Sequence, residues 1–279
     1  MKNLICYLNG KYVPLSQAQI SILDIGLLRG LSIFDFLRCY NGRLFLPDFH
    51  FQRFHNSAKA VGLKIPLSDE AIKKIILQLL AKNKLKEATA KIFLTGGESP
   101  DGLSFNLKTP TFFIIVSPAP AYPKSLFEKG AKLITHNHQR EKAVAKTSNY
   151  LTLLSLKKQK EKSGALEILY TSNGLILEGA TSNFFLIKNK VLITAKNNVL
   201  LGTRRRLILQ LAKNKFKVEE RPVKISELKN CDEAFICSTT RNIVPIVKID
   251  NLKIGNGRVG PVTKELMELI QKKIKKDCY

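Results

Sequence analysis

The stretch EKAVAKTSNYLTLL, residues 141–154, raises the question of what Lys146 does. Lys146 follows a small apolar run at 143–145 and precedes a helix-like pattern that begins at Tyr150. Most of the 46 lysines and arginines of this chain should be solvated surface charge. Lys146 is either one more surface charge or an amine held in a pocket for chemistry, and the surrounding sequence has to distinguish the two.

The composition indicates a globular protein. The chain has 279 residues, of which 44% are hydrophobic and 24% charged, enough for one large domain or two smaller ones. Its formal net charge of +24 indicates either a nucleic-acid or acidic-membrane binder or a lysine-rich solvated surface. Basic residues run through every segment without a nucleic-acid-binding motif, so we favour the solvated surface and keep nucleic-acid binding as a remote alternative.

The N-terminus shows no leader-like pattern, and no apolar run reaches a membrane-spanning length. The five cysteines are scattered and form no CxxC pair, which favours a reducing cytosol and a cytoplasmic protein. The four histidines offer no complete ligand set, so no metal site is expected. The GxGxxG match at 255–260 comes too close to the end of the chain for a βαβ unit, and we interpret it as a turn.

Strands and helices alternate along the chain. Asn-Gly pairs at 9–10 and 41–42 predict two hairpins, and Pro47 should open a helix. The three prolines of residues 117–125 predict a linker. We therefore expect an α+β protein with a small N-terminal domain (1–116), this linker, and a larger C-terminal domain (126–279). Further helices are expected at about 69–83, after Lys146, at about 204–214 and at about 262–275.

Three arginines follow Gly202-Thr203 at the start of a predicted helix, with Thr203 as the expected N-cap. The helix dipole disfavours cations there, so either an anion binds at this helix N-terminus or the arginines point into solvent. Ser238, Thr239 and Thr240 put three hydroxyls at a strand end, either for a phosphate or as an ordinary polar turn.

Glu178 lies in an otherwise apolar strand of the segment LEGATSNFF. A carboxylate in such a place needs a partner. The partner could be a protonated ring nitrogen or simply an arginine.

Taken in order, these segments resemble the fold-type IV pyridoxal-phosphate enzymes. That group includes branched-chain aminotransferases, D-amino-acid aminotransferases and aminodeoxychorismate lyases. The similarity runs from about residue 5 to about residue 275. It is carried by the motifs FHFQRFHNSAK, AKTSNYL, LEGATSNFF, LLGTRRRL, FICSTTRNIVPI and GRVGPVTK.

The resemblance implies a role for each matching residue. Lys146 would hold pyridoxal 5'-phosphate as an aldimine and move a proton, and Glu178 would pair with the pyridine nitrogen. Leu200 would support the ring, and Tyr150 would lie near its phenolic oxygen. The phosphate would be bound by the remaining set: Arg53, Thr203, Arg204, Ser238 and Thr239. Arg204 departs from the family, which usually has threonine there.

Substrate binding is implied for Arg29, Phe34, Lys91 and Thr240. Phe34 resembles the branched-chain enzymes, because the D-amino-acid enzymes have tyrosine there. Those enzymes also carry an Arg-x-His trap where this chain has Asp-Gly-Leu at 101–103. Arg29 resembles a less common transaminase group, in which an arginine binds the substrate α-carboxylate across a dimer interface. It could equally be half of a structural ion pair with Asp24 or Asp35.

The resemblance thus implies a cytoplasmic, homodimeric transaminase that moves an amino group between an α-amino acid, either a branched-chain L-amino acid or a D-amino acid, and a 2-oxo acid such as 2-oxoglutarate. The alternative within the same cofactor class is a 4-amino-4-deoxychorismate lyase that makes 4-aminobenzoate and pyruvate. Partners beyond a second copy and small molecules are not expected.

Overall fold

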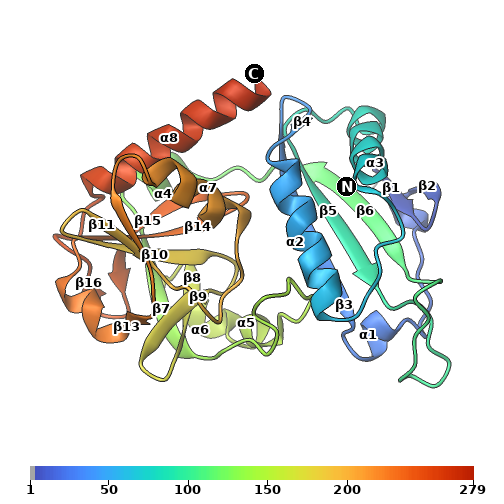
Figure 1. Cartoon of the computed structure of the whole chain (residues 1–279), viewed down its shortest axis with the longest axis horizontal. Helices are drawn as coiled ribbons and strands as arrows, with labels where there is room; N and C mark the ends of the chain where they lie inside the picture. Colours follow the sequence, from blue (N-terminus) through green and yellow to red (C-terminus); the bar gives the residue numbers. More distant parts are fainter. Residues whose placement is uncertain (1–3) are drawn as a thin grey trace. The chain divides into compact units, whose positions relative to one another are not determined.

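The computed structural model describes residues 4–279, which divide into two compact units (Figure 1). Unit 1 comprises the chain up to Pro120 together with Val144–Asn149 and Ile274–Tyr279. Unit 2 comprises Ala121–Ala143 and Tyr150–Lys273. The change of unit after Pro120 falls inside the segment predicted as a linker.

Unit 1 is built on a six-stranded antiparallel sheet in the order β2-β1-β6-β5-β3-β4. Asn9-Gly10 and Asn41-Gly42 form its two tight turns with positive φ angles, which confirms both predicted hairpins. The strands are β1 (Ile5–Leu8), β2 (Lys11–Pro14), β3 (Ser32–Tyr40), β4 (Arg43–Leu44), β5 (Ala88–Thr95) and β6 (Phe112–Pro118), and the helices are η1 (Leu15–Gln17), α1 (Ile25–Leu28), α2 (Pro47–Ala60) and α3 (Asp69–Lys82).

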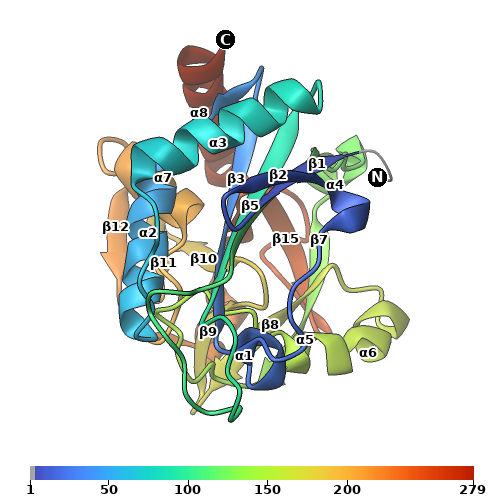
Figure 2. The ribbon, with the colours of Figure 1, turned by 90° about the vertical axis from the view of Figure 1, so that its right-hand side faces the viewer.

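Helices α2 and α3 cover one face of this sheet, with α2 along β3 and α3 along β1 and β6 (Figure 2). The period-two pattern of β3 turns Ile33 and Leu37 into the core between them, where each fully buried aliphatic side chain contributes about 1.5–3 kcal/mol. Helix α2 begins at Pro47, as predicted, and Ser68 caps α3 by accepting a hydrogen bond from the Ala71 N–H at 3.2 Å.

Unit 2 is built on a ten-stranded mixed sheet in the order β12-β11-β10-β14-β15-β7-β8-β9-β13, with β16 added beside β15. Three of its strand pairs are parallel: β11–β12, β7–β15 and β7–β8. The strands are β7 (Ala131–Asn137), β8 (Glu167–Ser172), β9 (Leu175–Gly179), β10 (Asn183–Lys188), β11 (Val191–Thr194), β12 (Lys217–Glu220), β13 (Val223–Lys224), β14 (Glu233–Ser238), β15 (Asn242–Ile249) and β16 (Leu252–Lys253).

The helices of unit 2 follow the sequence pattern with some differences. Helix α7 (Thr203–Ala212) and α8 (Pro261–Cys278, which ends in unit 1) confirm two predictions. The helix predicted after Lys146 is two short helices, α5 (Leu151–Ser155) and α6 (Lys157–Lys162). Two helices of unit 2 were not predicted: α4 (Lys124–Glu128), which starts at the end of the expected linker, and η2 (Ile225–Asn230).

The GxGxxG segment is a turn before α8, as predicted. The carboxylate of Glu233 accepts hydrogen bonds from the N–H groups of Val262 (3.0 Å) and Thr263 (2.8 Å) in the first turn of α8. A Cβ on Gly260 would lie 2.0 Å from Cδ of Glu233, so the glycine makes room for this cap. The motif therefore serves to start a helix.

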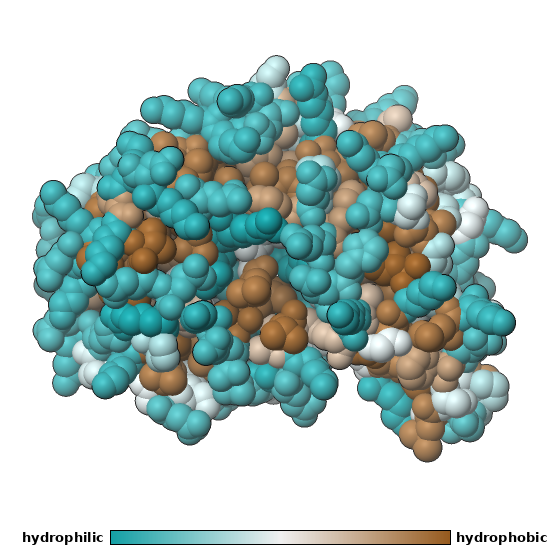
Figure 3. Space-filling view, in the orientation of Figure 1, coloured by the Kyte–Doolittle hydropathy of each residue, from teal (hydrophilic) through white to brown (hydrophobic). Residues whose placement is uncertain are grey.

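Hydrophilic side chains cover most of the face drawn in Figure 3, with small apolar areas between them. Among residues 4–279, no helix is both long enough and apolar enough to cross a membrane.

Candidate active site

The main chain of Lys146 is tied to unit 1 on both sides. Its carbonyl oxygen accepts a hydrogen bond from the Phe34 N–H at 2.9 Å, and its N–H donates to the Ser57 hydroxyl at 3.0 Å. Two residues on, the Ser148 N–H donates to the Ser32 carbonyl at 3.0 Å. The sequence division put Lys146 in the C-terminal part, whereas pairing with β3 and α2 joins its segment to unit 1.

The Lys146 side chain lies over an aromatic row on the second face of the unit 1 sheet. Its Nζ is 4.4 Å from the ring centroid of Phe34, within the range of a cation–π contact. The Phe34 ring stacks on Phe93 at 5.3 Å, and Phe93 stacks on Phe113 at 4.7 Å. Lys91, the predicted substrate residue, is exposed on this face with its Nζ 5.4 Å from the Phe36 ring. The face therefore combines an apolar wall with two ammonium groups.

Arg53 is held by an acidic partner that the sequence did not reveal. Its Nε and Nη2 each donate to a carboxylate oxygen of Asp35 at 2.8 Å, and Nδ1 of His50 lies 2.6 Å from Oδ1 of Asp35. Burial alone would raise the pKa of Asp35, but Arg53 and His50 hold it well below its ordinary value. Arg53 is thus fixed in α2 by a buried, ionised carboxylate.

Arg29 makes neither of the ion pairs considered for it. Within residues 4–279, Asp24 accepts hydrogen bonds from Thr95, Thr111 and Gly26, and Asp35 is taken by Arg53 and His50. The exposed Arg29 guanidinium donates to the carbonyl oxygen of Leu28 at 2.9 Å. Its charge is therefore accessible to solvent and to a ligand.

Glu178 is buried in β9 of unit 2, and an arginine is its partner, one of the two possibilities that the sequence left open. Oε1 accepts from Nε of Arg140 at 3.0 Å and from Nη2 of the same arginine at short distance. Oε2 accepts from the Leu200 N–H at 3.0 Å and from Nδ2 of Asn183 at 3.4 Å. Leu200 itself is buried.

Helix α7 begins two residues after Leu201, and its cap differs from the prediction. The N-cap is Gly202, and Thr203 is the first helical residue, because the Gly202 backbone is extended and Thr203 already has helical geometry. A Cβ on Gly202 would lie 2.1 Å from Oδ1 of Asn183, so only glycine fits there. The Thr203 hydroxyl is buried and has no hydrogen-bond partner among residues 4–279.

Arg204 is almost completely buried and connects α7 with the turn after β14. Its Nε donates to Oδ1 of Asn242 at 2.7 Å and its Nη2 to the carbonyl oxygen of Thr239 at 3.3 Å. The alternative of arginines pointing into solvent is therefore wrong for Arg204, and also for Arg205, which pairs with Glu220. The start of α7, the buried guanidinium of Arg204 and the turn after β14 therefore lie together in unit 2.

The remaining predicted residues lie at element ends of unit 2. Ser238 ends β14 and accepts a hydrogen bond from Nε of Arg241 at 3.2 Å, while Arg241 also pairs with buried Glu167. The Thr240 hydroxyl is 3.1 Å from the Tyr122 hydroxyl. Half-buried Tyr150 is the N-cap residue of α5.

Sequence reasoning missed Arg140, Asp35 and Ser57 as parts of the site. The position of Asp35 was a usable signal, because Asp35 lies between Ile33 and Leu37 on the buried face of a strand. Arg140 and Ser57 had none, because their contacts join residues 38 and 89 positions apart.

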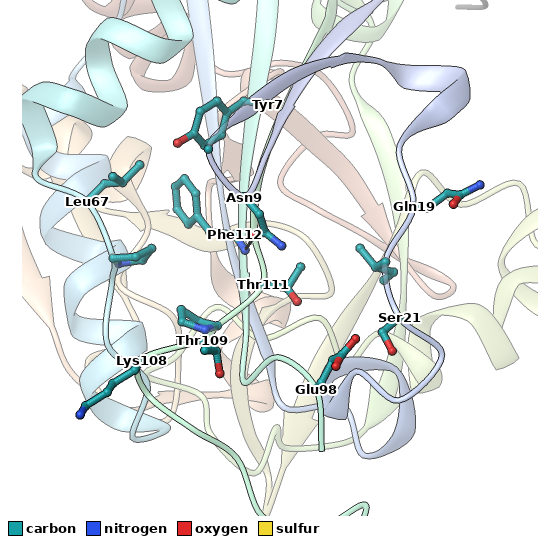
Figure 4. A pocket seen from close by; sticks show the side chains of 14 residues that line it. Tyr7, Asn9, Gln19, Ser21, Leu67, Glu98, Lys108, Thr109, Thr111 and Phe112 are labelled. Carbon is teal, nitrogen blue, oxygen red and sulfur yellow. Dashed lines mark hydrogen bonds between the residues drawn. The ribbon is translucent and has the colours of Figure 1, made fainter. Parts of the chain in front are cut away.

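Unit 1 also holds a cavity of about 760 Å³ (Figure 4). Tyr7, Asn9, Glu98 and Phe112 are among the residues that line it, and none of the lining residues is a predicted site residue. Residues 4–279 contain no cluster of three or more histidine, cysteine or acidic residues that could hold a metal ion.

Comparison with known proteins gives one consistent family. The family model described as amino-transferase class IV matches residues 32–249. A protein of Methanocaldococcus jannaschii, assigned by name to the branched-chain-amino-acid aminotransferases, is 35% identical over 272 residues, which cover 94% of this chain and 93% of the relative. The D-alanine aminotransferase of Bacillus licheniformis is 30% identical over 276 residues, which cover 95% of each chain.

Solved structures agree. The branched-chain amino acid aminotransferase of Escherichia coli matches with a TM-score of 0.90 at 27% identity, covering 97% of this chain and 94% of that one. Another branched-chain amino acid aminotransferase, from the organism abbreviated T.th. and solved with pyridoxamine 5'-phosphate, matches with a TM-score of 0.88 at 25% identity, covering 98% and 94%. The expected fold class, an α+β chain of the fold-type IV group, is confirmed.

Proposed function

The chain belongs to the class IV aminotransferase family, and from this premise we propose that it is a cytoplasmic, homodimeric transaminase that uses pyridoxal 5'-phosphate. It moves an amino group between an α-amino acid and a 2-oxo acid such as 2-oxoglutarate. The observation that carries the proposal is the run from Leu200 to Arg204. Its first residue holds the buried carboxylate of Glu178, and its last three form a helix start with a buried hydroxyl and a buried guanidinium.

The donors at the start of α7 fit a phosphate. Free N–H groups at a helix N-terminus and the helix dipole favour an anion, and a guanidinium adds charge-assisted hydrogen bonds. The buried Thr203 hydroxyl and the Arg204 guanidinium supply such donors, and Ser238 and Thr239 lie at the turn that Arg204 contacts. We assign the phosphate to these residues and to Arg53.

The carboxyl group of Glu178 in unit 2 fits a protonated ring nitrogen. Glu178 is a buried carboxyl group in an apolar strand that pairs with Arg140, and the main chain of Leu200 donates a hydrogen bond to it. We assign Glu178 to the pyridine nitrogen, Leu200 to the ring face and Tyr150 to the phenolic oxygen. When bound, pyridoxal phosphate supplies an electron sink for negative charge at the substrate α-carbon.

Lys146 is the group that we assign to covalent attachment and to proton transfer. Its ε-amine would be the nucleophile that holds the cofactor and would also serve as the base that takes the proton from the substrate α-carbon. The hydrogen bonds on both sides of its main chain keep its Cα in place while the side chain does both.

We assign substrate binding to Arg29, Phe34, Lys91 and Thr240. Arg29 would take the α-carboxylate, which its solvent-accessible guanidinium supports. The stacked phenylalanines at 34, 93 and 113 support an apolar substrate side chain. Such a substrate is a branched-chain L-amino acid or an apolar D-amino acid, and the relatives are named for both kinds.

A surface of unit 1 supports the homodimer. Ile22, Leu27 and Leu103 are 78%, 64% and 75% exposed, and apolar side chains that are exposed together mark interaction surfaces. Their two segments are joined, because the Ser99 N–H donates to the Leu23 carbonyl at 2.9 Å. We propose that a second copy covers this surface, which would place Arg29 at the interface. Light scattering should show a dimer for the wild type and a monomer for Leu27→Glu.

The function is tested by the absorbance spectrum of the protein with pyridoxal phosphate, before and after addition of L-leucine, L-glutamate, D-alanine or D-glutamate. Loss of the visible band of lysine-bound cofactor with one of them, and its return with 2-oxoglutarate, is the expected result. A band that no amino acid moves, with pyruvate released from aminodeoxychorismate, would replace the transaminase by the lyase. Absence of any band would overturn the proposal.

A further inference from the structure

The carboxylate of Glu178 is surrounded by protein donors of two kinds. Arg140 brings a positive charge to Oε1 through two nitrogens, while Leu200 and Asn183 bring neutral N–H groups to Oε2. The ion pair is inside the protein, since the side chains of Arg140 and Glu178 are 19% and 5% exposed. Nη2 of Arg140 also lies 3.4 Å from the carbonyl oxygen of Ala143, which anchors the arginine in its loop.

Two rings near Arg140, those of His138 and Tyr170, do not supply a second cation at neutral pH. The His138 ring packs edge-on against Tyr170 at 4.7 Å, and burial lowers the pKa of His138, with His136 and Arg140 adding to the effect. Burial also raises the pKa of Tyr170, which therefore stays neutral. The guanidinium of Arg140 therefore brings a full positive charge to Glu178.

A buried carboxylate that has only neutral donors is costly, and proton uptake is the usual way to remove the cost. A protonated Glu178 could not stabilise a positively charged ring nitrogen. A guanidinium that contacts a carboxylate through two nitrogens favours the anion and restricts the plane of the carboxylate, and Arg140 has this geometry. A guanidinium is suited to this task because it stays charged when it is buried.

We infer that Arg140 is a positioning residue that keeps Glu178 ionised and oriented, and thereby sets how tightly this chain holds the ring nitrogen of its cofactor. The inference rests on the proposed function. It assigns to Arg140 a role that acts through Glu178, and it predicts an effect on binding of the ring and not of the phosphate.

The test compares two cofactors on the apoprotein: pyridoxal phosphate and its analogue with a C–H group in place of the ring nitrogen. We expect Arg140→Met to weaken binding of pyridoxal phosphate by about 10- to 100-fold, the range typical for outer partners that orient a ligating group. Binding of the analogue should change by less than about twofold, since it lacks the nitrogen that Glu178 meets. Equal losses for both cofactors would show that Arg140 is merely structural and would overturn the inference.

Arg241→Met is the matched control, because it breaks another buried arginine–glutamate pair of unit 2. Arg241 and Glu167 are 10% and 4% exposed, and Arg241 contacts Ser238 on the phosphate side. This variant should weaken both cofactors equally. If it instead discriminates between them as Arg140→Met does, the effect does not come from Glu178 and the inference fails.

A double variant carries the test if Arg140→Met does not fold. Glu178→Gln combined with Arg140→Met removes both charges, and it should bind pyridoxal phosphate as Glu178→Gln alone does. A further loss of affinity for pyridoxal phosphate of more than about threefold would contradict an action through Glu178.

Two other outcomes separate this inference from the proposed function. Wild-type protein that binds neither cofactor would overturn the proposed function. If Arg140→Met keeps the wild-type preference for pyridoxal phosphate over the analogue, only this inference is overturned.

Discussion

The two units hold their reactive groups in different ways. In unit 1, Lys146 is positioned by its own main chain, through hydrogen bonds to β3 and to Ser57, and its side chain lies over the Phe34 ring. In unit 2, Glu178 is positioned through its side chain, by Arg140, Leu200 and Asn183.

The difference fits the roles that we propose for the two groups. A nucleophile that also carries protons needs a mobile side chain on a fixed Cα, which backbone hydrogen bonds provide. A buried anion needs compensation at its charged atoms and must not move. Substitutions at Lys146 should therefore affect chemistry alone, whereas substitutions at Glu178 should affect chemistry and folding together.

Lys146→Ala should give the largest loss, lowering turnover by about 10⁴-fold or more, since the covalent nucleophile is removed. The free energy of unfolding should change by less than about 1 kcal/mol, because the main-chain ties remain while a cation–π contact is lost. Steady-state kinetics and urea unfolding measure the two. Full activity would refute the mechanism, and a large stability loss would refute the claim that the main chain holds this residue.

Glu178→Gln should lower turnover by about 10²- to 10³-fold and also destabilise the fold by about 3 kcal/mol, because Arg140 is left as an uncompensated buried charge. Cofactor should still bind through its phosphate. The same two measurements apply, with an ultrafiltration assay for bound cofactor. A variant as stable as Lys146→Ala would remove the contrast between the units.

Asp35→Asn tests whether a buried ion pair between side chains also stabilises unit 1. It should lower the free energy of unfolding at pH 7 by about 3 kcal/mol, because Arg53 loses its buried anion. The pKa of Asp35 is depressed in the folded protein, so its stabilisation is present above the pKa of an unfolded aspartate and is lost as the pH falls through the folded value.

Unfolding curves from pH 7 to pH 3 check the sign of this effect. The difference between wild type and Asp35→Asn should stay constant down to about pH 5 and shrink below about pH 4. A difference that grew on acidification would contradict an ionised Asp35.

Ser57→Ala should have the smallest effect. It removes the hydroxyl that accepts the Lys146 N–H, at a cost of about 1 kcal/mol, so amide hydrogen exchange at Lys146 should quicken by about fivefold. Ser68→Ala, which removes the cap of α3 at a similar cost, is the control and should leave that amide unchanged. If amide hydrogen exchange at Lys146 became equally faster in both variants, the Ser57 hydroxyl would not specifically protect this amide.

The sequence predicted those parts of the fold that depend on local pattern. The hairpins at Asn9-Gly10 and Asn41-Gly42 and the start of α2 at Pro47 follow from neighbouring residues. Glu178 was recognised as a residue in need of a partner because charge in an apolar strand is costly wherever it occurs. Thr203 was misplaced by one position, because the close approach of Asn183 to Gly202 cannot be seen in the segment itself.

What remained hidden depends on contacts across long stretches of chain. Arg140 is one arginine among many and lies in a loop, so nothing near it marks it as the partner of Glu178. Likewise, helix-like residues follow Lys146 directly, yet its own segment pairs with β3, more than 100 positions earlier. Pairing of this kind, here an isolated bridge between Ile33 and Thr147, depends on the free edge of a distant strand.

That pairing has a consequence for how the chain is made. Ribosomes deliver the N-terminal end first, and N-terminal domains usually fold as soon as they emerge. Here the edge of β3 at Ser32 and Phe34 has to wait for residues 144–149, and unit 1 also draws on Ile274–Tyr279. Cutting the gene in the segment after Pro120 should therefore yield two fragments that fold poorly apart, the first with an uncovered strand edge that invites aggregation.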